Sequence, residues 1–518
     1  MKLIPDSTDK ITANYWCTWC SQSKFLDELP ADYRADLNTR TQKMRARLNE
    51  DFLFDDEKGL LTAYDFCGCR GDLIALLDDG WDVTPTAKTC EFGSLILNKA
   101  HFPSFAVEGD PAQSLKNLND RIRALGYRGL GLWIAAQCPK ETDEMPEADM
   151  EYARKYWIER AKWCHYAGVK YWKIDWGARC GDVAFRKMLT EICHTYAPGL
   201  IVEHAWVRWP MDPTAEERLW NTDWQYCMAN LLPQVLDCAD TFRTYDVIGE
   251  FHFVSTLGRM ADALLSPTIH PDLKGNDVMG IMNVEHLEYI AAGLGAAQGI
   301  MFHQGYRDRV NSTALDFELI FDGAMRVVRW NRIAAPFSIF KSENHLSKEI
   351  LCDQAELDQS DWPWFKGLKK AYAPASMSRN CALPQASPVT EGGDIPFVCA
   401  SKYPEGPLAI ATLPRTLSNA HISKPVRADV TIDGVDPDQP VGIFGLYNSL
   451  KIVFTEDISA RKVYAQDLLA DEAEDCTGAV TIHGNTLILS GDWIDRTGLA
   501  ARTHENDTSE PGLILKLS

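Results

Sequence analysis

VKYWKIDWGARCGD, residues 169–182, is the stretch that decides the fold of this chain. Tyr171 and Ile174 are typical of a buried strand, but Lys173 and Asp175 place two charges within it. Side chains two residues apart on a strand point to the same face, so this ammonium and this carboxylate are expected side by side at the strand's C-terminal end. The pair is either a structural ion pair or a sign that ligand binding or catalysis takes place where the strand ends.

Outward from this strand, strand-like and helix-like segments alternate through the first two thirds of the chain. The helix-like segments carry apolar residues three or four apart, as at Leu115, Leu118 and Ile122, and one of them ends on Gly168, a common helix C-cap. Eight such alternations predict a (β/α)8 TIM barrel. An open doubly wound sheet is the alternative, but no G-x-G-x-x-G follows the first strand. The expected strands are 13–21, 72–81, 127–137, 169–177, 199–206, 240–247, 276–283 and 298–305.

The alternation of strand-like and helix-like segments ends after about residue 340, and the helical spacing of apolar residues is lost from about residue 370. Short β-rich runs follow, such as GPLAIATL, LKIVFTE and GLILKLS, and Gly, Pro, Asn and Asp separate them. This pattern predicts a C-terminal antiparallel β-sandwich. We therefore expect a catalytic barrel over 1–340, a connecting helical segment over 341–370 and the sandwich over 371–518.

Composition limits the class of ligand. The 518 residues carry a formal net charge of −21 with no Lys/Arg-rich run, which argues against a nucleic-acid partner. The N-terminus lacks the apolar core of a signal peptide, and no run approaches 18 apolar residues, so a cytoplasmic protein without a membrane segment is expected, or an exported one if a leader was removed. Fifteen cysteines, an odd number, are expected to be mostly reduced and buried rather than zinc ligands. The oligomeric state stays open.

Acidic side chains collect at the expected C-terminal strand ends, where barrel enzymes carry their active sites. Carboxylates accept hydroxyl hydrogen bonds, so such a ring suits a polyhydroxylated ligand. It also offers the two carboxylates that glycoside chemistry needs, with Asp175 the better nucleophile beside Lys173 and Asp246 the better acid/base. Magnesium bound by Asp78, Asp79, Asp175 and Asp246 is the alternative, which the adjacent Lys and Arg oppose. No metal and no cofactor is expected.

Five motifs in fixed order strengthen the glycosidase interpretation: LLDDGW, HFPSF, GLWIAAQ, YWKIDWG and FRTYDV. Together they resemble the α-galactosidase clan, glycoside hydrolase families 27 and 36, and WCTW before DDGW is similar to the raffinose synthase branch of family 36. The resemblance covers roughly residues 13–305, and a β-sandwich after the barrel is also what these families carry. One departure is Gly177, where family 36 often has Asn.

The resemblance implies roles for individual residues. Asp175 matches the nucleophile and Asp246 the acid/base. The residues that it implies, or that the barrel ends suggest, for substrate binding are Lys173, Arg243, Asp78 and Asp79 (for the 4- and 6-hydroxyls), Glu203 and Trp206 (for the 2-position), Trp16 or Trp19 as a wall, and Trp133 and Asp277.

The expected function is therefore an exo-acting retaining α-glycosidase that releases a terminal α-galactosyl or related α-linked sugar from an oligosaccharide or glycoside. Two alternatives remain open. A raffinose-synthase-like α-galactosyl transglycosylase would use the same residues with a sugar acceptor in place of water. A non-catalytic carbohydrate-binding barrel would keep the fold without turnover.

Overall fold

The structure is a computed structural model of the chain. The residues that it describes are 1–24, 37–82, 93–139, 149–206, 232–244, 252–265, 278–285, 287–306, 320–357, 367–416 and 423–518.

Eight parallel strands close into a barrel in chain order, with the first strand paired to the eighth, which confirms the predicted TIM barrel. The strands are shorter than their apolar runs because only the central residues pair. They are β1 Tyr15–Cys17, β2 Ile74–Leu77, β3 Gly129–Ile134, β4 Tyr171–Ile174, β5 Ile201–Trp206, β6 Thr241–Thr244, β7 Ile281–Glu285 and β8 Ala297–Ile300.

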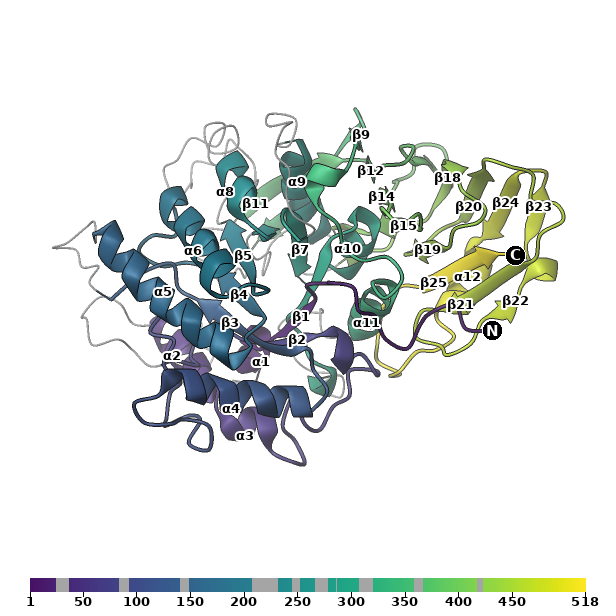
Figure 1. Ribbon diagram of the computed structural model, residues 1–518. Helices are drawn as coiled ribbons and strands as arrows, with labels where there is room; N and C mark the ends of the chain where they lie inside the picture. The colour runs from purple at the N-terminus through teal and green to yellow at the C-terminus, as the bar shows by residue number, and fades with distance from the viewer. Residues whose placement is uncertain are drawn as a thin grey trace.

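Helices surround this barrel, as Figure 1 shows for α4, α5 and α6. Aspartates cap their first turns: the side chain of Asp110 accepts a hydrogen bond at the start of α4, and Asp182 does so at α6. Gly168 ends α5 with a φ of 73°, as the sequence predicts. The helices in the described residues are α1 Trp19–Lys24, α2 Leu37–Arg47, α3 Glu50–Phe54, α4 Pro111–Ala124, α5 Met150–Ala167, α6 Val183–Tyr196, α8 Leu232–Cys238, α9 His252–Leu265, α10 Glu288–Leu294, α11 Phe321–Trp330 and α12 Gly491–Gly498.

Alternation along the strands divides the barrel residues between two cores. Tyr15, Cys17 and Tyr171 belong to a small core inside the barrel, whereas Trp16 and Trp172 belong to the large core between the strands and the helices. On β8, Gly299 leaves room for its neighbours, since a Cβ there would lie 2.6 Å from Glu285 Cγ and 2.9 Å from the hydroxyl of Tyr15. The barrel interior is thus filled by large side chains and not hollow.

Two larger sheets form the C-terminal part and enclose a core of their own, which confirms the expected sandwich. Their orders are β22-β21-β25-β19-β15-β14-β12-β9 and β13-β18-β20-β24-β23. Most pairs are antiparallel, but β12/β14, β15/β19 and β18/β20 are parallel. The strands are β9 Asn344–Leu346, β10 Ile350–Leu357, β11 Gly367–Pro374, β12 Ser376–Arg379, β13 Gln385–Pro388, β14 Phe397–Lys402, β15 Leu408–Leu413, β16 Arg415–Thr416, β17 Ser423–Lys424, β18 Ala428–Val435, β19 Val441–Phe444, β20 Ser449–Phe454, β21 Val463–Asp467, β22 Glu474–Asp475, β23 Thr481–His483, β24 Thr486–Ser490 and β25 Gly512–Leu517.

The expectation of a helical segment over 341–370 is wrong, because the described residues of this range form strands. Apart from a single 3-10 turn, Ile339–Lys341, its described residues contain β9, β10 and the start of β11. β10 and β11 pair as an antiparallel ribbon, and Asp353 on β10 is buried and binds Arg415, while its neighbour Cys352 is exposed. This alternation is that of a half-covered strand, and the charged residues around it hide it in the sequence.

The barrel and the first sheet of the sandwich share one apolar core, which contains residues of β4 and of β14 alike. Figure 1 shows α10 and α11 between the two parts. The hydroxyl of Tyr403 donates to the Ala292 carbonyl at 2.8 Å, and buried Arg326 on α11 forms an ion pair with Asp467 on β21 at 3.1 Å. The C-terminal sheet is therefore packed onto the barrel helices.

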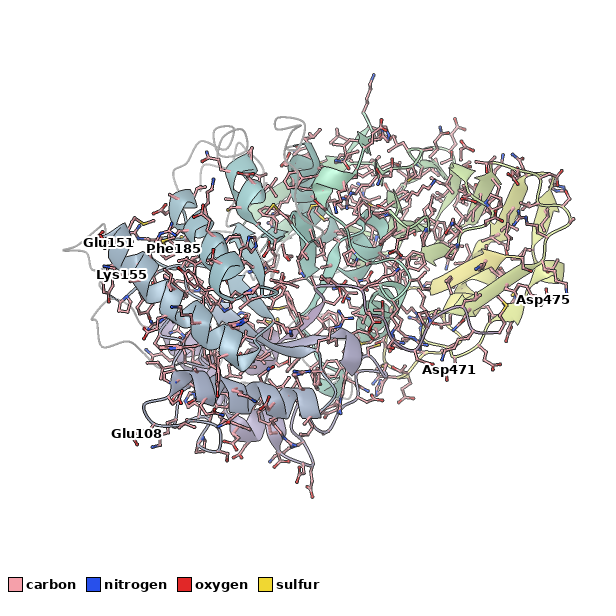
Figure 2. All side chains as sticks on the ribbon, viewed as in Figure 1. Glu108, Glu151, Lys155, Phe185, Asp471 and Asp475 are labelled. Carbon is pink, nitrogen blue, oxygen red and sulfur yellow. The ribbon has the colours of Figure 1, made fainter. Side chains whose placement is uncertain are left out.

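Exposed acids carry part of the large negative charge. The exposed side chain of Asp471 lies on the lower side of the sandwich, 3.8 Å from Arg329 on α11 (Figure 2). Glu151 on α5 forms an exposed ion pair with Lys155 one turn later, at 2.6 Å. Among the helices of the described residues, none combines the length and apolarity needed to cross a membrane.

Candidate active site

Lys173 of β4 lies between two carboxylates at the C-terminal end of the barrel. Its Nζ is 3.1 Å from Asp78 Oδ2, just after β2, and 3.1 Å from Glu285 Oε1, at the end of β7. The thiol of Cys17 donates to the same Asp78 oxygen at 3.0 Å. Lys173 is 1% exposed, so its charge is held by protein carboxylates and not by bulk water.

Arg243 of β6 is the second buried cation and contacts three carboxylates. Its Nε donates to Glu203 at 3.1 Å, its Nη1 donates to Glu285 at 3.0 Å, and its Nη2 is 3.6 Å from Asp175 Oδ2. Glu285 thus bridges Arg243 and Lys173. The cluster joins residues of β4, β5, β6 and β7 to Asp78 after β2, as expected from parallel strands whose C-terminal ends meet.

Two tyrosines below this layer fix its acids. Tyr171 donates to Glu203 Oε2 at 2.7 Å, and Tyr15 donates to Glu285. The two rings meet edge to face with centroids 5.3 Å apart. Because these side chains fill the barrel interior, they leave the carboxylates in one orientation.

Asp175, the expected nucleophile, lies just past the end of β4 and is 7% exposed. The indole Nε1 of Trp133 donates to its Oδ2 at 3.1 Å. Its other oxygen, Oδ1, accepts no hydrogen bond from the described residues. One carboxylate oxygen is therefore held, and the other is unengaged by these neighbours.

Asp79 is held differently from Asp78. Arg45 of α2 grips both oxygens of Asp79, with its Nε 2.9 Å from Oδ1 and its Nη2 2.8 Å from Oδ2. Such a bidentate pair fixes the carboxylate plane and occupies both oxygens. Of the two neighbouring acids, Asp78 thus binds Lys173, while Asp79 binds Arg45 of α2.

Burial acts strongly on these charges. It opposes the charged form of Lys173, but Asp78, the Cys17 sulfur and Glu285 outweigh it and hold the pKa of Lys173 well above the ordinary value. Burial raises the pKa of Glu203 to about 7 against the opposing charge of Arg243, and it raises the pKa of Asp79 to about 6 against Arg45. Lys173 therefore keeps its charge, while burial makes Glu203 and Asp79 take up protons at higher pH than ordinary carboxyl groups do.

The structure gathers Asp78, Lys173, Asp175, Glu203 and Arg243 into one cluster and places Trp133 on it. Asp79 lies beside it. Asp246 and Asp277 lie outside the described residues, as does the side chain of Trp206.

The two tryptophans expected as a wall differ from each other. The expectation that Trp16 forms a wall of the sugar site is wrong. Its ring is fully buried in the outer core against Phe66 and His303, so it does not reach the cluster. Its neighbours in sequence, Tyr15 and Cys17, point inward, so alternation turns Trp16 outward. Trp19 begins α1, where a continuing strand was expected, and packs half-buried against the inner core.

Glu285 is the main residue that sequence reasoning missed. The expected seventh strand ends at residue 283, whereas β7 runs to Glu285. The signal was present: in IMNVE, Ile281, Asn283 and Glu285 share one face, and Ile281 belongs to the inner core. Arg45 was also missed, since nothing in its helix marks it as a partner of Asp79.

In the part of the chain that the structure describes, no three His, Cys, Asp or Glu side chains are grouped to hold a metal ion. At the cluster itself, Lys173 and Arg243 occupy the positions between the carboxylates.

No family model and no curated protein sequence matches the chain. Among solved structures it is similar to a GH27 β-L-arabinopyranosidase of Geobacillus stearothermophilus, at 10% identity and a TM-score of 0.38 over 88% of this chain and 92% of that one. It is also similar to α-galactosidase I of Mortierella vinacea, at 12% identity and a TM-score of 0.37 over 98% and 96% of the two chains.

An α-amylase of Geobacillus thermoleovorans matches as well, at 10% identity and a TM-score of 0.40 over 99% of this chain and 98% of that one. Identities and TM-scores this low assign no activity to the chain. A functional conclusion must therefore come from the residues at the barrel mouth and from the motifs that carry them.

Proposed function

We propose that the protein is an exo-acting retaining α-glycosidase that releases a terminal α-galactosyl or closely related residue. The observation that carries the proposal is Asp175: a rim carboxylate with Oδ2 held by Trp133 and Oδ1 unengaged by the described residues. A nucleophile for glycosyl transfer needs this combination of fixed direction and one reactive oxygen.

The surroundings of Asp175 support a neutral, hydroxyl-rich ligand. Four carboxylates, Asp78, Asp175, Glu203 and Glu285, surround the two cations Lys173 and Arg243. Carboxylates accept hydrogen bonds from hydroxyl groups, and the ammonium and guanidinium donate hydrogen bonds to hydroxyl oxygens. An anionic sugar would meet several acids in a site of low exposure, so neutral glycosides are the expected substrates.

In the proposed mechanism, Asp175 attacks the anomeric carbon while Asp246 protonates the departing glycosidic oxygen. The C–O bond to the leaving group breaks as the bond to Asp175 forms, and Asp246 then takes a proton from the water that releases the sugar. Arg243, whose Nη2 is 3.6 Å from Asp175 Oδ2, places a positive charge beside the nucleophile. The role of Asp246 rests on its place three residues after Arg243 and on the motif resemblance.

The test separates the two carboxylates. With a 2,4-dinitrophenyl α-galactoside, Asp175→Ala should lose at least about 1,000-fold in kcat, whereas Asp246→Ala should keep forming the glycosyl-enzyme because this leaving group needs no protonation. Azide should then rescue Asp246→Ala to the α-galactosyl azide and Asp175→Ala to the β-anomer. The matched control is Asp471→Ala, at an exposed aspartate of the sandwich domain, which should retain full activity. Unchanged turnover in both site variants would overturn the proposal.

A further inference from the structure

Trp176, directly after Asp175, is an exposed aromatic residue at the mouth of the barrel. Its side chain is 39% exposed although it adjoins a deeply buried charged cluster. Its ring lies 5.8 Å from that of Trp133, centroid to centroid, at an interplanar angle of 60°. Since Trp133 also donates to Asp175, two indoles and the nucleophile share one corner of the mouth.

The backbone holds this corner in place. The carbonyl of Trp176 accepts a hydrogen bond from Ala136 N, after β3, at 2.9 Å. The next residue, Gly177, has a φ of 149°, and a Cβ there would lie 2.7 Å from the Ala136 carbonyl oxygen. The loop after β4 thus packs against the loop after β3, and these contacts hold the backbone of Trp176 at the barrel mouth.

Position decides which part of a substrate this indole meets. Lys173 and Glu203, which are expected to bind sugar hydroxyls, are almost fully buried, so the proposed function puts the transferred sugar on the side of Asp175 that faces this cluster. Trp176 stands at the outer edge and meets what remains toward the solvent. An indole face offers apolar contact without charge, which suits the C–H face of a pyranose or an aromatic ring.

We propose that Trp176, backed by Trp133, forms the leaving-group subsite and takes the apolar face of a pyranosyl or aryl aglycone. The inference rests on the proposed glycosidase function. It makes Trp176 a specificity-determining residue for the group that departs, separate from the acids that bind the transferred sugar.

Three substrates with one sugar test this: α-galactosyl fluoride, phenyl α-galactoside and an α-galactosyl disaccharide. The fluoride has no surface to stack, so Trp176→Ala should leave its kcat/KM within about twofold while lowering kcat/KM for the other two roughly five- to tenfold. Trp176→Phe should recover most of the loss. Tyr166→Ala, at an exposed aromatic residue on α5, is the matched control and should change none of the three.

The outcomes separate the two ideas. If the wild-type protein turns over all three substrates and Trp176→Ala loses as much on the fluoride as on the disaccharide, Trp176 serves the fold or Asp175, and the subsite proposal alone is wrong. If the wild-type protein turns over none of them, the glycosidase proposal fails, and the subsite proposal that rests on it fails too.

Discussion

Glu285 binds both cations of the cluster at once, 3.1 Å from Lys173 and 3.0 Å from Arg243. Tyr15 donates to it from below, and Gly299 leaves the space for its side chain. Without this carboxylate the two cations would face each other with one fewer counter-charge in a site of low exposure. We therefore expect Glu285 to keep Lys173 and Arg243 apart and correctly directed.

Glu285→Gln tests that expectation, because it keeps the shape and removes the charge. Breaking a buried ion pair by removing one partner costs about 3–5 kcal/mol, so the free energy of unfolding should fall by about 3 kcal/mol and Tm with it. Chemical denaturation measures the change. Glu349→Gln, at an exposed glutamate, is the control and should be neutral. A Glu285→Gln protein as stable as the wild type would show that Asp78 and Glu203 suffice.

At the scale of the element, the segment after β4 depends on one glycine. Gly177 combines a left-handed φ with a distance of 2.7 Å from its virtual Cβ to the Ala136 carbonyl oxygen. This explains why the Asn that family 36 often carries at this position is not compatible with the backbone seen here. The contact also fixes Trp176 and Asp175, which precede it.

Gly177→Ala should therefore disturb both stability and the site. Strain of this kind costs about 1–3 kcal/mol, and the displacement should lower kcat for any active glycoside more than it lowers affinity. Gly181→Ala in the same loop is a matched control, since a Cβ there meets no atom within 4 Å. Thermal melts of both variants measure the loss of stability, and steady-state kinetics measure the change in kcat and KM. Equal behaviour of the two variants would contradict the assigned strain.

The elements also show what could be predicted from the sequence. Apolar runs and their order place all eight strands of the barrel, because burial on both faces gives each strand a continuous signal. The ends of the strands are harder to predict, since they depend on where backbone pairing with the neighbouring strands stops. The expected seventh strand ends at residue 283, two residues before the end of β7, so Glu285 is not predicted as a residue of the barrel mouth.

The second property that the sequence does not determine is the side of the strand to which a side chain points. Trp16 and Tyr15 are adjacent aromatic residues on a three-residue strand, and only the closed barrel decides that Tyr15 points inward. Arg45 reaches Asp79 from a different helix, a contact that no local pattern encodes. The two charges of YWKID could be placed at the barrel mouth from their spacing, but not their partners: Lys173 pairs with Asp78 and Glu285, and Asp175 lies near Arg243.

On the scale of the whole molecule, the contact between barrel and sandwich contains a buried acid, Glu288 on α10. It is 5% exposed, and its Oε2 has no hydrogen-bond partner among the described residues. Burial, with Glu510 and Asp507 nearby, raises its pKa well above the ordinary value of 4.5. The folded protein keeps this proton at pH values where the unfolded chain has lost it.

Stability should accordingly decrease with rising pH on account of Glu288. Its contribution is complete below about pH 4.5 and is lost progressively up to the raised pKa, at about 1.4 kcal/mol per pH unit. Glu288→Gln removes the titration, so its Tm relative to the wild type should rise as the pH increases from 5 toward the raised pKa of Glu288. Calorimetry at several pH values measures this difference, with exposed Glu391→Gln as the control. A constant difference would rule out the buried proton.

The order of the eight-stranded sheet has a consequence for how the chain is made. β25, Gly512–Leu517, lies between β19 and β21, both of which precede it in the sequence. On a ribosome, β19 and β21 emerge first but cannot join each other, because the place between them belongs to a strand still to be translated. Both would wait with unpaired edges, which are sites of wrong association. The sheet that packs on the barrel helices is therefore expected to form completely only after β25 has been translated. Chaperones that cover strand edges should act between the synthesis of β19 and that of β25.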